Sequence, residues 1–76
     1  MKSQIGLIGI GVMGENLVLN MENKGFSISV FDISKDKVER FIGGRGKGKN
    51  IQGCLDIQEL VDSLTLPRKI MMMIPA

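Results

Sequence analysis

The sequence predicts an α/β fold, the first half of a doubly wound parallel sheet with element order βαβαβαβ and strand order 3-2-1-4. Short apolar runs alternate along the 76 residues with segments whose apolar residues recur at helical spacing. Strands that alternate with helices form parallel sheets, because a helix supplies the crossover that parallel neighbours need. The first apolar run also leads into a glycine-rich turn, Gly9–Gly14, which is typical of the strand-to-helix turn in such sheets.

The first three elements follow from the apolar pattern of residues 5–31. Ile5–Ile8 is a short apolar run that ends at a glycine, which predicts a strand buried on both faces. Met13–Lys24 carries apolar side chains at i, i+1 and i+4 and is followed by Gly25, which predicts an amphipathic helix. Phe26–Phe31 alternates with the period of a second strand.

The next two elements are a helix and a short strand. Ser34 is placed to cap the second helix, which the two glycines at positions 43 and 44 end. The expected inner face of this helix consists of Val38, Phe41 and Ile42. Ile51–Leu55 predicts a short third strand after a glycine-rich, basic segment.

The last two elements are a third helix and a fourth strand. Asp56 followed by Glu59 resembles a capping box and marks the start of the helix, which Pro67 ends. The expected buried face of this helix consists of Ile57, Leu60, Val61 and Leu64. Lys69–Ile74 is the last strand, and we expect its Met71–Met73 run to be a buried strand and no soft-metal site.

The segment Gly9-Ile10-Gly11-Val12-Met13-Gly14 has the GxGxxG spacing of a dinucleotide-binding (Rossmann) turn. A strand precedes it, a helix follows it and a second strand comes next, which is the context that this chemistry requires. Gly9 permits the tight turn, Gly11 leaves room for a pyrophosphate at the backbone, and Gly14 permits close packing of helix and strand. The alternative is a turn that uses glycine for its shape alone.

Asp32 ends the second predicted strand, where an acidic side chain can accept hydrogen bonds from the hydroxyls of the adenosine ribose. Its charge would repel a 2′-phosphate and therefore favours NAD over NADP. Asp32 could instead belong to a polar turn or cap the second helix. Nearby side chains that could meet a 2′-phosphate, or form a solvated helix face, are Ser34, Lys35, Lys37 and Arg40.

Composition excludes several other classes of function. The net charge of +2 provides no electrostatic surface for nucleic acid, and no apolar run reaches the roughly 18 residues of a membrane span. The absence of histidine excludes His-based metal sites and general bases within these residues. The single cysteine, Cys54, fits a reducing compartment and is expected to be an inert, partly buried thiol. Gly43–Asn50 resembles a triphosphate-binding loop but follows a helix and lacks the final Ser or Thr, so we interpret it as an exposed loop.

Four segments closely resemble 6-phosphogluconate dehydrogenases. They are Ile5–Asn20, Lys24–Phe26, Glu59–Leu64 and Pro67–Ile74. The Val-Met-Gly sequence before the Asn-x-x-x-Asn helix is shared with that family. The Pro-Arg pair before the last strand distinguishes the family from the related 3-hydroxyisobutyrate dehydrogenases, which share the glycine segment. The Gly43–Gly53 segment matches least.

The resemblance implies an NAD(P)-dependent, decarboxylating oxidoreductase of the cytoplasmic pentose phosphate pathway and of gluconate utilization. Such an enzyme converts 6-phosphogluconate to ribulose 5-phosphate and CO₂, and it is a homodimer. Residues 1–76 would be the N-terminal part of the dinucleotide-binding domain, inactive alone, with the substrate-binding and catalytic residues elsewhere. By position, the resemblance implies cofactor contacts from Gly9, Ile10, Gly11, Val12, Met13, Gly14, Asp32, Ile33, Ser34, Ile74, Pro75 and Ala76. No catalytic residue and no metal ligand is expected among these 76.

The chain departs from the family pattern at three places. Many NADP-using members have Ala at the position of Gly11 and Asn-Arg-Thr at Asp32–Ser34, and the family often has Lys at the position of Pro75. The missing arginine at Ile33 removes the main clamp for a 2′-phosphate and supports NAD or mixed use. Two other functions stay open from the sequence: the cofactor-binding part of a 3-hydroxyisobutyrate-type β-hydroxyacid dehydrogenase, and a non-catalytic NAD-sensing module.

Overall fold

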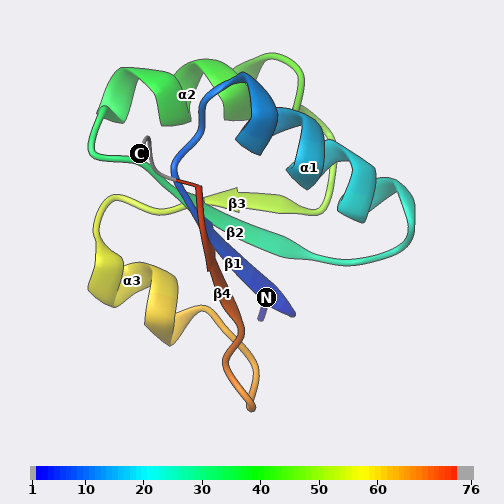
Figure 1. Ribbon diagram of the computed structural model, residues 1–76, viewed down its shortest axis with the longest axis vertical. Helices are drawn as coiled ribbons and strands as arrows, with labels where there is room; N and C mark the ends of the chain where they lie inside the picture. Colours follow the sequence, from blue (N-terminus) through cyan, green and yellow to red (C-terminus); the bar gives the residue numbers. More distant parts are fainter. Residues whose placement is uncertain (1, 74–76) are drawn as a thin grey trace.

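A computed structural model describes residues 2–73 of the chain (Figure 1). The elements are β1 (Ile5–Ile8), α1 (Val12–Asn23), β2 (Ile28–Phe31), α2 (Lys35–Gly43), β3 (Ile51–Gly53), α3 (Ile57–Asp62) and β4 (Ile70–Met72). The predicted order βαβαβαβ is therefore confirmed. Each predicted strand is present but shorter than expected, except β1, whose bounds agree with the prediction.

The four strands form one parallel sheet in the order β3-β2-β1-β4. Ile5 pairs with Ile28, which in turn pairs with Ile51, and Gly6 pairs with Ile70 on the other side of β1. The predicted strand order 3-2-1-4 is confirmed. This order places the carboxyl ends of β1 and β2 side by side, and ligands of open α/β sheets bind at that edge.

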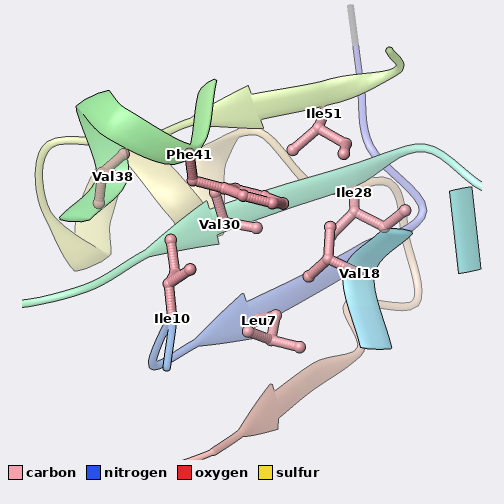
Figure 2. Packing of buried hydrophobic residues seen from close by; sticks show 8 residues of the cluster. All are labelled: Leu7, Ile10, Val18, Ile28, Val30, Val38, Phe41 and Ile51. Atoms are coloured by element: carbon pink, nitrogen blue, oxygen red, sulfur yellow. The ribbon is translucent and has the colours of Figure 1, made fainter. Parts of the chain in front are cut away.

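Helices α1 and α2 cover one face of the sheet, and α3 covers the other (Figure 1). The face under α1 and α2 holds the hydrophobic core. Its buried members are Leu7, Ile10, Val18, Ile28, Val30, Val38, Phe41 and Ile51 (Figure 2). Figure 2 shows the ring of Phe41 reaching from α2 across β2 beside Val30. Burial of these side chains stabilises the fold by roughly 1.5–3 kcal/mol for each large apolar residue.

The face under α3 is built from small and hydroxyl-bearing side chains. Ser29 of β2 donates a hydrogen bond to the hydroxyl of Ser3 at 2.7 Å, and both side chains are fully buried. The hydroxyl of Ser63, just after α3, lies 2.7 Å from both Ser29 Oγ and the carbonyl oxygen of Leu60. These contacts attach the C-terminal end of α3 to the sheet, because a buried hydroxyl without a partner is costly.

Two helix caps predicted from sequence are present. Ser34 Oγ accepts the N–H of Lys37 at 3.4 Å, and Asp56 Oδ1 accepts the N–H of Glu59 at 2.7 Å. Gly25, which follows α1, has φ of +100°, the left-handed conformation expected of a glycine after a helix. The local signals thus place the starts of α2 and α3 correctly. Helix α1 is one residue off at each end, and α3 ends at Asp62, before Pro67, which was expected to end it.

Two predictions of burial are wrong. The Met71–Met73 run is not a buried strand: β4 is an exposed edge strand, and Met72 is 62% exposed. The reason is that β4 has only β1 as a neighbour and no described helix lies over it. Ile57 is 52% exposed, although the spacing placed it on the inner face of α3. Leu60, near the C-terminal end of α3, and Leu64, two residues after the helix, are the side chains that are buried next to Gly6 of β1.

None of the helices in residues 2–73 has the length and apolar character that crossing a membrane requires.

Replacement of Ser29 by alanine should lower the free energy of unfolding by about 1–2 kcal/mol, because Ser3 then loses its buried donor. Denaturant unfolding followed by circular dichroism measures this change. The matched control is Ser27→Ala, which removes an exposed acceptor 3.2 Å from the Gln4 N–H and should cost less than about 0.5 kcal/mol. Equal midpoints for the two variants would show that the buried hydroxyls do not stabilise α3 against the sheet.

Candidate functional site

The turn between β1 and α1 lies at the carboxyl edge of the sheet. Gly9 has φ of +102°, a conformation that other residues rarely adopt. A Cβ at Gly9 would also collide with the carbonyl oxygen of Met73, whose N–H donates to the Ile8 carbonyl at 2.7 Å. The turn is therefore packed against the end of β4, and only glycine fits at its first position.

The second and third glycines of the turn have different surroundings. A Cβ at Gly14 would collide with the carbonyl oxygen of Gly9 and lie 3.6 Å from Leu7 Cδ2, so this glycine lets α1 approach the turn and β1. A Cβ at Gly11 would meet no atom within 4 Å. Gly11 is exposed, and the space beside it is open to a ligand.

The N-terminus of α1 differs from those of the other two helices. Its N-cap is Gly11, which has no side chain to accept a hydrogen bond, whereas Ser34 and Asp56 cap α2 and α3. Within residues 2–73, no acceptor is found for the N–H groups of Gly11, Val12 or Met13. Open N–H groups and the positive end of the helix dipole together make an anion-binding site.

Asp32 connects the ends of β1 and β2. Its Oδ2 accepts the N–H of Ile10 at 2.7 Å, and its Oδ1 accepts the N–H of Ser34 at 2.8 Å. Asp32 thus has the turn-forming role that the sequence left open. A carboxylate has about four acceptor positions, so each oxygen keeps one for another donor.

A pocket of about 660 Å³ opens beside the glycine turn. It is lined by Ile8, Gly9, Gly11, Val12, Met13, Gly14, Asp32, Ile33, Lys37, Met72 and Met73. Seven of the twelve residues predicted to contact a cofactor are in this lining: Gly9, Gly11, Val12, Met13, Gly14, Asp32 and Ile33. The structure therefore brings the glycine turn and the end of β2 together around one space.

The other five predicted residues are not in the lining. The side chain of Ile10 is 2% exposed and belongs to the core, so only its backbone contributes to the turn. Ser34 caps α2 instead. Ile74, Pro75 and Ala76 lie outside the described residues.

Three lining residues were not among the candidates from the sequence: Ile8, Met72 and Met73. Lys37 was one of the basic side chains that could meet a 2′-phosphate, and it is in the lining, whereas Lys35 and Arg40 are not. Helical side chains lean toward the N-terminus of their helix, which here points Lys37 toward the end of β2. Its ammonium is the only cation among the described residues that line this pocket.

A smaller pocket of about 250 Å³ also has Asp32 and Ile33 in its lining, together with Lys35 and Glu39 of α2. Cys54 lies in its wall but is fully buried. Burial raises the pKa of the Cys54 thiol. A thiol with a raised pKa is a poor nucleophile near neutral pH.

No cluster of three or more His, Cys, Asp or Glu side chains that could hold a metal ion occurs in the described part of the chain.

Comparisons with known proteins place these observations in a family. Residues 4–76 match the family model described as the NAD binding domain of 6-phosphogluconate dehydrogenase. The chain is 55% identical over 75 residues to a decarboxylating 6-phosphogluconate dehydrogenase of Dictyostelium discoideum, with 99% of the chain and 15% of that protein covered. It is 54% identical over 76 residues to the decarboxylating enzyme of Treponema pallidum, with 100% of the chain and 16% of that protein covered.

A third relative specifies a cofactor in its name. The NADP(+)-dependent, decarboxylating 6-phosphogluconate dehydrogenase of Bacillus subtilis is 52% identical over 75 residues, which cover 99% of the chain and 16% of that protein. The chain thus spans 15 or 16% of the length of these relatives. The match covers the glycine turn, Asp32 and all four strands, and the chain belongs to the family of the NAD-binding domain of 6-phosphogluconate dehydrogenase.

Proposed function

We propose that the chain holds a nicotinamide dinucleotide, with the pyrophosphate at the N-terminus of α1. The observation that carries the proposal is the open surroundings of Gly11, where a Cβ would meet no atom within 4 Å and where α1 begins without a cap. A phosphate placed there would accept hydrogen bonds from the open N–H groups and meet the positive end of the helix dipole.

The adenosine ribose is proposed to lie against Asp32. Both carboxylate oxygens are used by backbone N–H groups, and the remaining acceptor position of each is available to one ribose hydroxyl. Because Asp32 is held from two sides, its oxygens need no reorganisation when the ribose binds.

NAD is proposed as the preferred cofactor over NADP. The Asp32 charge opposes a 2′-phosphate, and Ile33, which is 95% exposed, offers no cation at the next position. Lys37 is the one cation among the described lining residues, and its ammonium supports residual NADP binding. The name of the Bacillus subtilis relative makes NADP the competing choice.

The whole-protein activity proposed for this site is that of a decarboxylating 6-phosphogluconate dehydrogenase. The enzyme would oxidise 6-phosphogluconate to ribulose 5-phosphate and CO₂, with the bound dinucleotide as the hydride acceptor. Residues 1–76 would supply the cofactor-binding part, and catalytic residues would come from elsewhere in the protein. The names of the relatives support this proposal, and by the same resemblance we propose a cytoplasmic, homodimeric enzyme. The family match favours it over a 3-hydroxyisobutyrate-type enzyme.

Substitutions at two glycines should separate binding from folding. Gly11→Val should weaken NAD binding at least tenfold, because the added side chain occupies the phosphate position, while the free energy of unfolding changes by less than about 1 kcal/mol. Gly14→Ala should instead destabilise the fold by more than about 2 kcal/mol, because its Cβ collides with the Gly9 carbonyl. Calorimetric titration with NAD and thermal unfolding measure the two effects, and NAD binding by Gly11→Val at unchanged affinity would refute the pyrophosphate position.

Ile33→Arg should shift the preference toward NADP, tightening NADP binding about tenfold relative to NAD by adding a guanidinium beside the 2′-position. Separate titrations with NAD and NADP measure the ratio of dissociation constants. Ile33→Gln is the matched control, with similar length and no charge, and should leave the ratio unchanged. If the unmodified chain binds NADP more than about tenfold tighter than NAD, the proposed NAD preference is wrong.

The apolar edge of β4 supports self-association. Ile70 and Met71 are each 40% exposed, and the strand contains no charged residue that would discourage pairing with another copy. We expect a concentration-dependent dimer in light scattering that Met71→Lys weakens. Leu66→Lys, a charge added at an exposed apolar side chain outside the strand, should not weaken it. A monomer at high concentration would contradict this expectation.

A further inference from the structure

The basic loop between α2 and β3, residues 44–50, is tied to α1 by side chains at both of its ends. Arg45 Nη1 donates to Glu15 Oε1 at 2.9 Å, and Arg45 Nη2 donates to Asn16 Oδ1 at 2.8 Å. At the other end, Glu22 Oε2 accepts the backbone N–H of Asn50 at 3.1 Å. The loop runs beside α1 (Figure 1), although nearly all of its residues are exposed to solvent.

Glu15 places a negative charge close to the open N-terminus of α1. It lies in the first turn of α1, directly after Gly14, and its side chain is only 25% exposed. A negative charge in a first turn stabilises the helix dipole, but it also opposes any anion that binds at the same helix end. Limited exposure to water weakens the screening of that charge.

The pocket itself has little charge to offset Glu15. Its lining contains one carboxylate, Asp32, and one ammonium, Lys37, so the two formal charges cancel. Without a partner, Glu15 would leave this end of α1 with an excess negative charge. Arg45 is the cation that contacts Glu15, and it comes from a segment distant in sequence.

We propose that Arg45 is a positioning residue for dinucleotide binding: by neutralising Glu15 and holding its carboxylate away on the α2 side, it keeps the α1 N-terminus receptive to the pyrophosphate. The inference rests on the proposed function. Arginine suits this role because its planar fork reaches Glu15 and Asn16 together, whereas a lysine ammonium on a flexible stem would not be held by both.

The test compares four variants of the chain by calorimetric titration with NAD: Arg45→Ala, Glu15→Gln, the double variant that combines them, and Arg40→Ala. Arg40 is the matched control, because its removal changes the net charge equally but its Nε contacts only the Asp36 carbonyl of its own helix, at 3.5 Å. Arg45→Ala should weaken NAD binding about two- to fivefold at low salt, and Arg40→Ala should not. The defect of Arg45→Ala should disappear at about 1 M salt, where charges are screened beyond roughly 3 Å.

The double variant discriminates between charge compensation and simple support of the loop. It lacks the contacts of Arg45 with α1 but also lacks the Glu15 charge, so its NAD affinity should return to the level of the unmodified chain. An affinity as low as that of Arg45→Ala would overturn the inference, as would equal affinities for Arg45→Ala and Arg40→Ala. If the unmodified chain itself fails to bind NAD or NADP, the proposed function fails, and this inference fails with it.

Discussion

The Asp32 carboxylate accepts the N–H of Ile10 at 2.7 Å and that of Ser34 at 2.8 Å, and so joins the turns that follow β1 and β2. Those turns lead into α1 and α2, so one side chain sets the spacing of both helix starts at the carboxyl edge of the sheet. The turn after β1 is further constrained by Gly9, which has no room for a side chain beside Met73. The position of the open N-terminus of α1 is therefore set by contacts of residues outside α1, those of Asp32 and Gly9.

The N-termini of α2 and α3 are capped by side chains, whereas the N-terminus of α1 is left open beside the pocket. Ser34 and Asp56 satisfy the first turns of α2 and α3 with their own side chains, which stabilises each helix by about 1 kcal/mol. Helix α1 has Gly11 in the same position, which costs about a few tenths of a kcal/mol relative to a Ser or Asp cap. The N–H groups of its first turn stay available to a ligand. The negative charge of Glu15 in that turn stabilises the helix through its dipole. Arg45 pairs with Glu15 from outside the pocket and offsets its charge, so that Glu15 can stabilise α1 without opposing an anion at the same helix end.

Much of the fold was predictable because its signals are local. The apolar run Ile5–Ile8 and the cap at Asp56 depend on residues within one element, and both agree with the structure. Errors arose where burial depends on neighbours. The apolar character of Met72 predicted a buried strand, yet β4 is an edge with exposed side chains, and the helical spacing of Ile57 did not reveal that its side chain is exposed. Periodicity reports which side chains share a face but not what covers that face.

The sequence by itself determined the element order, the parallel sheet and the glycine turn, since these follow from hydrophobic period, glycine spacing and the need for crossovers. Only the tertiary structure decided which side chains surround the turn. Asp32 could have been a ligand contact or a turn residue, and its two bonds to backbone N–H groups give it the turn role while its side chain still lines the pocket. Lys37 was one of several basic candidates, and only the folded chain shows that it lines the pocket. The contact of Arg45 with Glu15 joins segments that are distant in sequence, which no local pattern encodes.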